Sequence, residues 1–118
     1  MRGTVLLVDG ADAVDAEPLR AAGLIVYEAQ HIDRVHDRML DIAPDIIVIV
    51  GSAMTLLVPE LRRCADYATS ILVVGSERER DEARRAGADS FLPPSADLLY
   101  EIRRALILRR SGRRLPWI

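Results

Sequence analysis

Runs of consecutive aliphatic residues constrain the fold of this chain more than any other feature of its sequence. Three such runs lie within residues 4–8, 45–50 and 70–74, and none of them alternates between apolar and polar side chains. A strand with one face in water alternates in this way, whereas a strand that is covered on both faces is continuously apolar. The runs therefore predict the strands of a parallel sheet that is covered by helices on both faces.

Two weaker strands and five helices complete the predicted order of elements. Residues 24–27, which follow Gly23, and residues 90–92, which precede Pro93, are expected to form the two remaining strands. Helices are expected between the strands and after the last one, at residues 13–22, 31–43, 55–68, 77–86 and 96–110. Strands and helices that alternate over short connections predict an α/β fold with a doubly wound, five-stranded parallel sheet.

Glycine, proline and capping residues set the expected ends of these helices. Gly23 and Gly87 are expected to stop the helices before them, because glycine adopts the left-handed conformation that ends a helix. Pro59 is expected in the first turn of its helix, since proline lacks the N–H that later turns need. The last helix is expected to begin with Ser95 or Asp97 as its N-cap.

The length and composition of the chain indicate one domain and narrow the choice of partners. The chain has 118 residues, half of them hydrophobic, and a formal net charge of −2. Neither nucleic acid nor a membrane is therefore an expected partner. No apolar run approaches the roughly 20 residues that cross a bilayer, so a cytoplasmic location is expected. The one cysteine, Cys64, excludes an internal disulfide and a cysteine zinc site.

A basic segment ends the chain. Residues 103–114 hold six arginines and no carboxylate. The domain is expected to span residues 1–110, and residues 111–118 are expected to form a basic C-terminal tail or the start of a linker. If the segment is a tail, Trp117 is expected to fold back onto the domain or to dock on a partner, because tryptophan is a favoured interface residue.

Three short motifs follow one another along the chain: Val-Leu-Leu-Val-Asp at residues 5–9, Pro-Asp-Ile-Ile-Val-Ile at 44–49 and Gly-Ala-Asp-Ser-Phe-Leu-Pro at 87–93. Residues 19–27 add the end of a first helix and a second strand. In this order and spacing, the motifs resemble the receiver domain of two-component response regulators over nearly the whole chain. The resemblance implies a CheY-like, flavodoxin-like sheet with strand order 2-1-3-4-5 and a role in signal transduction.

Phosphoryl transfer to a receiver domain needs five groups with separate roles, as the resemblance implies. Two carboxylates after the first strand hold Mg²⁺, which prefers oxygen ligands in an octahedral shell. An aspartate at the end of the third strand accepts the phosphoryl group and binds the metal. A hydroxyl group after the fourth strand and a lysine after the fifth strand bind the phosphoryl oxygens.

The metal and acceptor positions have lost most of these groups. By the resemblance, Asp9 keeps the first carboxylate, but the second position is Gly10. The acceptor position is Val50, or Gly51 if the alignment shifts by one residue, and neither side chain accepts a phosphoryl group. A weak cation site at Asp9 and Asp12 is disfavoured against a loop hydrogen bond and a helix cap, because a hard cation needs several carboxylates. No metal and no cofactor are therefore expected.

The hydroxyl and lysine positions are also changed. The hydroxyl position falls on Gly75, with Ser76 one residue later, and the lysine position falls on Pro94. Phe91 matches the aromatic residue that swings inward in receiver domains when the hydroxyl group moves toward the phosphoryl group. Without that hydroxyl group, Phe91 is expected either to keep one rotamer or to belong to a binding surface. The chain is therefore predicted to be a degenerate pseudo-receiver with no catalytic residue.

The last predicted helix carries a wider apolar arc than one face of a sheet requires. In receiver domains the face formed by the fourth helix, the fifth strand and the fifth helix binds partners, so we expect a homodimer through this face. The alternative is that the charged residues there form a solvated surface. The candidate contact residues are Leu99, Arg103, Leu106, Arg110 and Trp117.

Two functions of different kinds are consistent with these positions. The first is a phosphorylation-independent signalling module of a two-component-type pathway, which acts by binding a signalling protein or kinase. The second is a ligand-gated sensor whose small molecule occupies the vacated acidic pocket beside Asp9, Gly51 and Ser76. An enzyme is not expected, because the sequence has no glycine-rich phosphate loop and no nucleophile–base pair.

Overall fold

The computed structural model of the chain describes residues 2–8, 14–29, 41–50, 54–64, 69–94 and 97–110, with the backbone alone described for residues 54–57, 64, 109 and 110. Five strands form one sheet: β1 (Thr4–Val8), β2 (Ile25–Ala29), β3 (Ile46–Val50), β4 (Ser70–Val74) and β5 (Ser90–Leu92). Their order across the sheet is β2-β1-β3-β4-β5, and every neighbouring pair is parallel. This arrangement confirms the predicted fold class and strand order.

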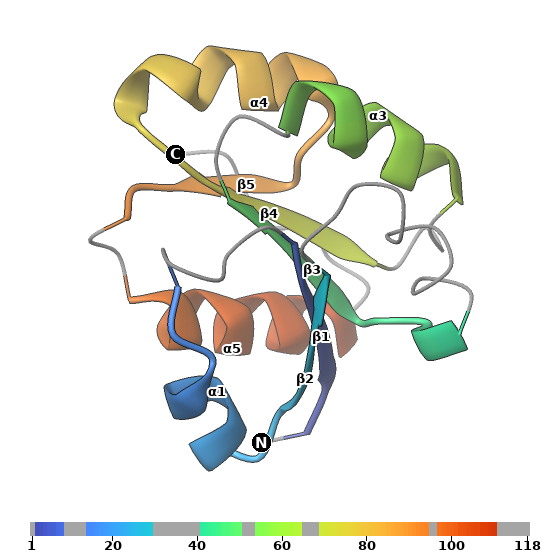
Figure 1. Cartoon of the computed structure of the whole chain (residues 1–118), viewed down its shortest axis with the longest axis vertical. Helices are drawn as coiled ribbons and strands as arrows, with labels where there is room; N and C mark the ends of the chain where they lie inside the picture. The colour runs from blue at the N-terminus through green and yellow to red at the C-terminus, as the bar shows by residue number, and fades with distance from the viewer. Residues whose placement is uncertain are drawn as a thin grey trace.

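Four α-helices in the described part of the chain cover the two faces of the sheet. α1 (Glu17–Ala21) and α5 (Leu98–Arg110) lie against one face, and α3 (Met54–Cys64) and α4 (Arg80–Ala86) lie against the other (Figure 1). A 3₁₀-helix, η3 (Glu77–Glu79), leads into α4, so the segment predicted as one helix is divided in two. The helix predicted at 31–43 falls largely outside the described residues. None of the described helices is long and apolar enough to cross a membrane.

The two faces of the sheet carry separate apolar cores, because successive residues of a strand point to opposite faces. Val5 of β1 lies in one core with Leu19 of α1 and Ile102 of α5. Leu6, the next residue, lies in the other core with Leu61 of α3. All five residues of β3 are buried. The continuous apolar runs of the sequence therefore correspond to strands with helices on both sides.

α1 begins at Glu17, later than predicted. Pro18 explains the difference, because in a longer helix its ring nitrogen would face the carbonyl of Val14 without an N–H to donate. Asp15 precedes the helix, and its Oδ1 accepts a hydrogen bond from the N–H of Glu17 at 3.0 Å. The predicted cap, Asp12, lies outside the described residues. This side-chain hydrogen bond therefore fixes the segment before α1, for which the sequence predicted a further helical turn.

Pro59 lies in the second turn of α3, which corrects its predicted place in the first turn. Its missing N–H and its ring cost the helix about 3 kcal/mol. Val58 and Leu61, close to it in the same helix, are 0% exposed. Burying each of these side chains contributes about 1.5–3 kcal/mol. Tertiary packing therefore offsets the local cost of the proline.

The glycines predicted to stop two helices and the aspartate predicted to cap a third are confirmed. Gly87 follows α4 with a φ of +105°, and Gly23 follows α1 with a φ of +98°. Glycine adopts these left-handed angles without steric cost. Asp97, one of the two residues predicted to cap the last helix, accepts a hydrogen bond at Oδ1 from the N–H of Tyr100 at 3.1 Å. The other, Ser95, lies outside the described residues.

Arg62 of α3 joins the segments that lead into β4 and β5. Its guanidinium donates to the carbonyl oxygens of Thr69 at 3.1 Å and Gly87 at 3.3 Å, and it pairs with the carboxylate of Asp89. Asp89 is 8% exposed, and the same carboxylate oxygen accepts the N–H of Ile71 at 2.8 Å. A buried carboxylate needs such partners, because an uncompensated charge in the interior is costly. Arg62 therefore fixes α3 to the starts of two strands.

Arg62→Met should destabilise the protein more than Arg63→Met. The first change removes the guanidinium of Arg62 from the buried carboxylate of Asp89, so we expect the free energy of unfolding to fall by about 2–4 kcal/mol. Arg63 pairs with Glu60 at the surface, where 72% and 45% of the two side chains are exposed. The second change should therefore cost less than about 1 kcal/mol. Urea denaturation measures both costs, and equal values would contradict the role of Arg62.

Candidate functional site

The carboxyl edge of the sheet bears the positions at which the sequence predicts a degenerate phosphorylation pocket. Val50, at the acceptor position, is the last residue of β3 and lies beside Val74 of β4 in the strand register. It is 8% exposed and belongs to the apolar core shared with α1 and α5. Asp9, Gly10 and Gly51 lie outside the described residues. The described part of this edge therefore has a buried alkyl side chain at the position predicted for the acceptor.

A glutamate fills the space beside Gly75, the position predicted for the hydroxyl group. Gly75 is buried, and its N–H donates to the carbonyl oxygen of Leu92 at 3.0 Å. A Cβ atom at this position would lie 2.9 Å from Oε1 of Glu79 and 3.4 Å from Cε2 of Phe91. The first distance is too short for a carbon–oxygen contact, so any side chain here displaces the carboxylate of Glu79. Any larger residue at position 75 therefore requires the flexible end of Glu79 to move.

Ser76 holds the carboxylate of Glu79 in this position. Oε1 of Glu79 accepts hydrogen bonds from the N–H of Ser76 at 2.9 Å and from its hydroxyl group at 3.1 Å. In return, the N–H of Glu79 donates to the carbonyl oxygen of Ser76 at 2.9 Å. The hydroxyl group of Ser76 therefore takes part in closing the first turn of η3. A serine three residues before a glutamate is the sequence signal that could have predicted this cap.

Phe91 lies in the core on the face covered by α3 and α4, where it is 5% exposed. Arg80 covers the ring, with its guanidinium carbon 5.1 Å from the ring centroid, within the range of a cation–π contact. Arg80 also donates from Nε to Oε1 of Glu77 at 2.6 Å, and this hydrogen bond lowers the pKa of the Glu77 carboxyl group below its ordinary value. Of the two roles predicted for Phe91, this burial favours a fixed rotamer over a surface contact.

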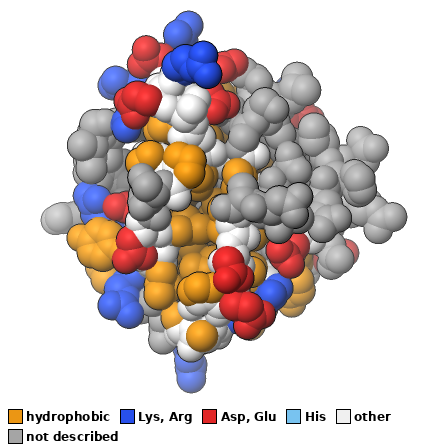
Figure 2. All heavy atoms as spheres, turned by 60° about the vertical axis from the view of Figure 1, so that its left-hand side comes forward, with side chains coloured by type: hydrophobic (Ala, Val, Ile, Leu, Met, Phe, Trp, Pro, Cys, Tyr) orange, Lys and Arg blue, Asp and Glu red, His pale blue; other side chains and the backbone are white. Residues whose placement is uncertain are grey.

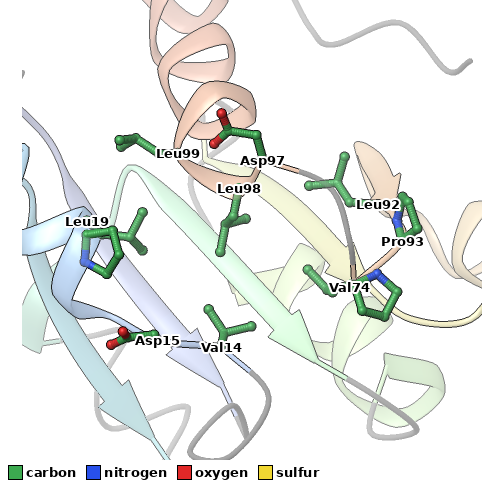
Figure 3. Close-up of a pocket in the computed structure, with 11 residues that line it drawn as sticks. Val14, Asp15, Leu19, Val74, Leu92, Pro93, Asp97, Leu98 and Leu99 are labelled. Atoms are coloured by element: carbon green, nitrogen blue, oxygen red, sulfur yellow. The ribbon is translucent and has the colours of Figure 1, made fainter.

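A cavity of about 270 Å³ opens at the same edge, on the face covered by α1 and α5. Three buried side chains form its floor: Leu19, Val74 and Leu92. Pro94, the position predicted for the lysine, is exposed at its rim. Figure 3 shows the side chain of Leu98 pointing into the space between the start of α5 and the end of β4. The end of β5 therefore leads into a hollow and not onto a flat surface.

Two carboxylates stand at the rim of this cavity, Asp15 before α1 and Asp97 before α5. Ser76, a predicted ligand contact, does not belong to the described lining, so the cavity differs from the pocket expected beside it. The sequence analysis missed Asp15 and gave Asp97 only a capping role. Both aspartates precede helices, and this local signal does not reveal that they share one hollow.

Hydrophobic side chains gather on the side of the molecule to which β5 leads. Figure 2 turns this side, on the left of Figure 1, toward the viewer, and a band of hydrophobic side chains crosses its middle with acidic side chains beside it. Within the described residues, no group of three or more His, Cys, Asp and Glu side chains comes together to hold a metal ion. The described surface is therefore mixed in character, apolar in its centre and charged around it.

The candidate contact residues of α5 divide into exposed and buried ones. Arg103 is exposed, and Leu99 is half-buried in the wall of the cavity. Leu106 is 5% exposed and belongs to the core of the α1 and α5 face. It covers the sheet and is not available to a partner, which corrects its prediction as a contact residue. The side chain of Arg110 and all of Trp117 lie outside the described residues.

No protein-family model and no curated protein matches the sequence. Solved structures nevertheless have the same fold. NtrX from Brucella abortus, in complex with ADP, has a TM-score of 0.81 at 21% identity over 95% of this chain. A putative response regulator from Chloroflexus aurantiacus J-10-fl has a TM-score of 0.75 at 23% identity over 91% of this chain. A CheY-like receiver domain protein from Methanospirillum hungatei JF-1 has a TM-score of 0.80 at 17% identity over 95% of this chain.

These similarities define the architecture of the chain as the CheY-like receiver fold. The chain spans 28% of the length of the NtrX chain and 99% of the length of the other two. Identities of this size establish the fold alone.

Gly75→Ala should destabilise the protein mainly while Glu79 is present. The added methyl group displaces the carboxylate of Glu79 from Ser76, so we expect the free energy of unfolding to fall by about 1–2 kcal/mol. In a Glu79→Ala background the methyl group meets no carboxylate, and the same change should cost about half as much or less. Urea unfolding of the two single variants and the double variant measures the coupling. Strictly additive costs would show that Glu79 does not occupy this space.

Proposed function

We propose that this chain is a pseudo-receiver, a signalling module of a two-component-type pathway that works without phosphorylation of an aspartate. One observation carries the proposal: the acceptor position holds Val50, whose side chain lies in the apolar core. Phosphoryl transfer to a protein needs a nucleophilic atom, and an alkyl side chain has none. The chain thus combines the receiver fold with a position that cannot accept the phosphoryl group.

The neighbouring positions support the same proposal. Gly75 has no hydroxyl group, and the carboxylate of Glu79 occupies the space beside it. A carboxylate repels phosphoryl oxygens, whereas phosphoryl transfer needs positive or hydrogen-bond-donating groups there. Pro94 stands where a lysine would neutralise those oxygens. We therefore assign no catalytic residue and no cofactor to the chain.

The exposed side of α5 is the proposed contact surface. Tyr100 is 59% exposed and Ile107 is 55% exposed, and Arg103 lies between them in the sequence. Spacings of three and four residues place these side chains on one side of a helix. Aromatic and arginine side chains are enriched at protein interfaces. Tyr100 was not among the predicted contacts, although its spacing from Arg103 is visible in the sequence. We infer a homodimer through this surface, with the adjoining α4 and β5.

The proposed module acts on a protein partner, such as a signalling protein or a kinase. Residues 1–110 would form the module, and residues 111–118 would form its basic tail or the start of a linker. The net charge of −2 gives no reason to expect nucleic acid or a membrane as partner. A cytoplasmic location is the setting in which such a pathway would operate.

A ligand-gated sensor is the second candidate function, and the cavity beside Pro94 is the observation that favours it. Open α/β sheets bind ligands at the carboxyl ends of their strands. Small-molecule sites are concave and mostly apolar, with a few polar groups that set the orientation of the ligand. The cavity has this composition, but it lies on the face covered by α1 and α5 and not beside Ser76.

Acetyl phosphate with Mg²⁺ should leave the intact mass of the full chain unchanged, because no carboxylate stands at the acceptor position. Beryllofluoride, which mimics the phosphoryl group, should likewise leave the amide NMR spectrum unchanged. A receiver domain that has its acceptor aspartate serves as the positive control in both measurements. Saturable shifts that depend on Mg²⁺ and cluster around Val50 would overturn the proposal.

The full chain should sediment as a dimer in a concentration series. Arg103→Glu combined with Ile107→Asp should raise the dimer dissociation constant by about tenfold or more, because the change places like charges across the two-fold contact. Arg63→Glu, a charge reversal on the exposed surface of α3, is the matched control and should leave the constant unchanged. A monomer at every concentration would sink the homodimer while leaving the pseudo-receiver assignment in place.

A further inference from the structure

We propose that the cavity between α1 and the β5–α5 connection binds a small organic cation, with an ammonium or guanidinium group on an apolar body. This inference rests on the second candidate function and deepens it, because it names the class of ligand for the same cavity, whether or not the chain dimerises. It rests on the apolar floor of the cavity, on the two carboxylates at its rim and on its place in the fold.

The floor of the cavity provides the affinity. Leu19, Val74 and Leu92 are 2%, 6% and 6% exposed, and Val14 and Leu98 form half-buried walls. An apolar cavity of about 150 Å³ holds a benzene ring, so a cavity of about 270 Å³ accommodates a ring with a short side chain. Apolar ligand surface leaves water when it enters such a space, which is favourable.

The rim selects the charge of the ligand. Asp15 and Asp97 enter it from different segments and lie on different sides of Leu98 (Figure 3). Each carboxylate accepts a backbone N–H at Oδ1, from Glu17 at 3.0 Å and from Tyr100 at 3.1 Å. These hydrogen bonds orient the carboxylates, and neither forms an ion pair with an arginine of the described residues. Both therefore remain able to accept a hydrogen bond from a ligand cation.

The amino end of α5 does not reverse this selection. The N-terminus of a helix acts as about half of a positive charge, whereas the two ionised carboxylates carry two negative charges. The field at the rim therefore stays negative. It favours a cationic ligand over a neutral one, and a neutral ligand over an anion.

The place of the cavity in the fold also supports a ligand. Val74 and Leu92 are the last residues of β4 and β5. Ligands of open α/β sheets bind outside the carboxyl ends of the strands. The segments before α1 and before α5 meet here, and each contributes one of the two carboxylates.

Titration of the full chain with 2-phenylethylamine tests the proposal, with 2-phenylethanol and phenylacetate as neutral and anionic probes of similar size. Two-dimensional NMR follows each titration. We expect saturable shifts from the amine at Val14, Val74, Leu92 and their neighbours. The affinity for the amine should exceed that for the alcohol by about two- to tenfold, and phenylacetate should not saturate.

Asp15→Asn and Asp97→Asn remove the charges while keeping the local structure. The amide oxygen can accept the same backbone N–H, and asparagine caps a helix as well as aspartate does. Each change should weaken the binding of the amine by about two- to fivefold and leave the affinity for the alcohol unchanged. Asp81→Asn, in the first turn of α4, is the matched control and should change neither affinity.

Three results would overturn the proposal: equal affinity for the three probes, shifts that fall away from the cavity, or no saturation by the amine. Unchanged affinity for the amine in both asparagine variants, with unaltered thermal unfolding, would also overturn it, because the carboxylates would then not select the cation.

Discussion

Apolar contact on both faces of β3 is the constraint on which the rest of the structure depends. All five of its residues are buried, so the central strand has to be covered by α1 and α5 on one side and by α3 on the other. Each such side chain contributes about 1.5–3 kcal/mol when it is fully buried. Val50 extends this contact to the carboxyl end of the strand. The valine at the predicted acceptor position therefore also continues the core to the edge of the sheet.

The sequence was sufficient to predict the strands, because a strand covered on both faces leaves an uninterrupted apolar run. β1, β4 and β5 have the predicted bounds, and the order of the sheet followed from the receiver resemblance. The bounds of the helices and the side chains that they bury were harder to predict, because they depend on contacts between residues that are distant in the sequence. Pro59 remains inside α3 since Val58 and Leu61 pack on the sheet. Leu106 lies within a wide apolar arc, and only the position of α5 on the sheet decides that it is buried.

The candidate site divides in the same way. The roles predicted for Val50, Gly75 and Pro94 come from the sequence, because the receiver resemblance assigns a chemical group to each of these positions. The sequence does not show that a cavity lies at this edge of the sheet. The cavity brings together the segment before α1, the ends of β4 and β5, and the start of α5, which are separated by many residues along the chain. No local sequence pattern shows that these segments lie together, and even the aspartates at the rim of the cavity resemble ordinary helix caps.

The contact between Gly75 and Glu79 has a consequence for which substitutions this chain tolerates. Position 75 and the carboxylate of Glu79 share one volume, and the same carboxylate closes the turn that starts at Ser76. A side chain with a hydroxyl group at position 75 would displace the carboxylate of Glu79 and open that cap. Replacing Glu79 as well would make room for the hydroxyl group, but it would leave the turn without its cap. The stability of this turn and the size of the side chain at position 75 are thus coupled through Glu79.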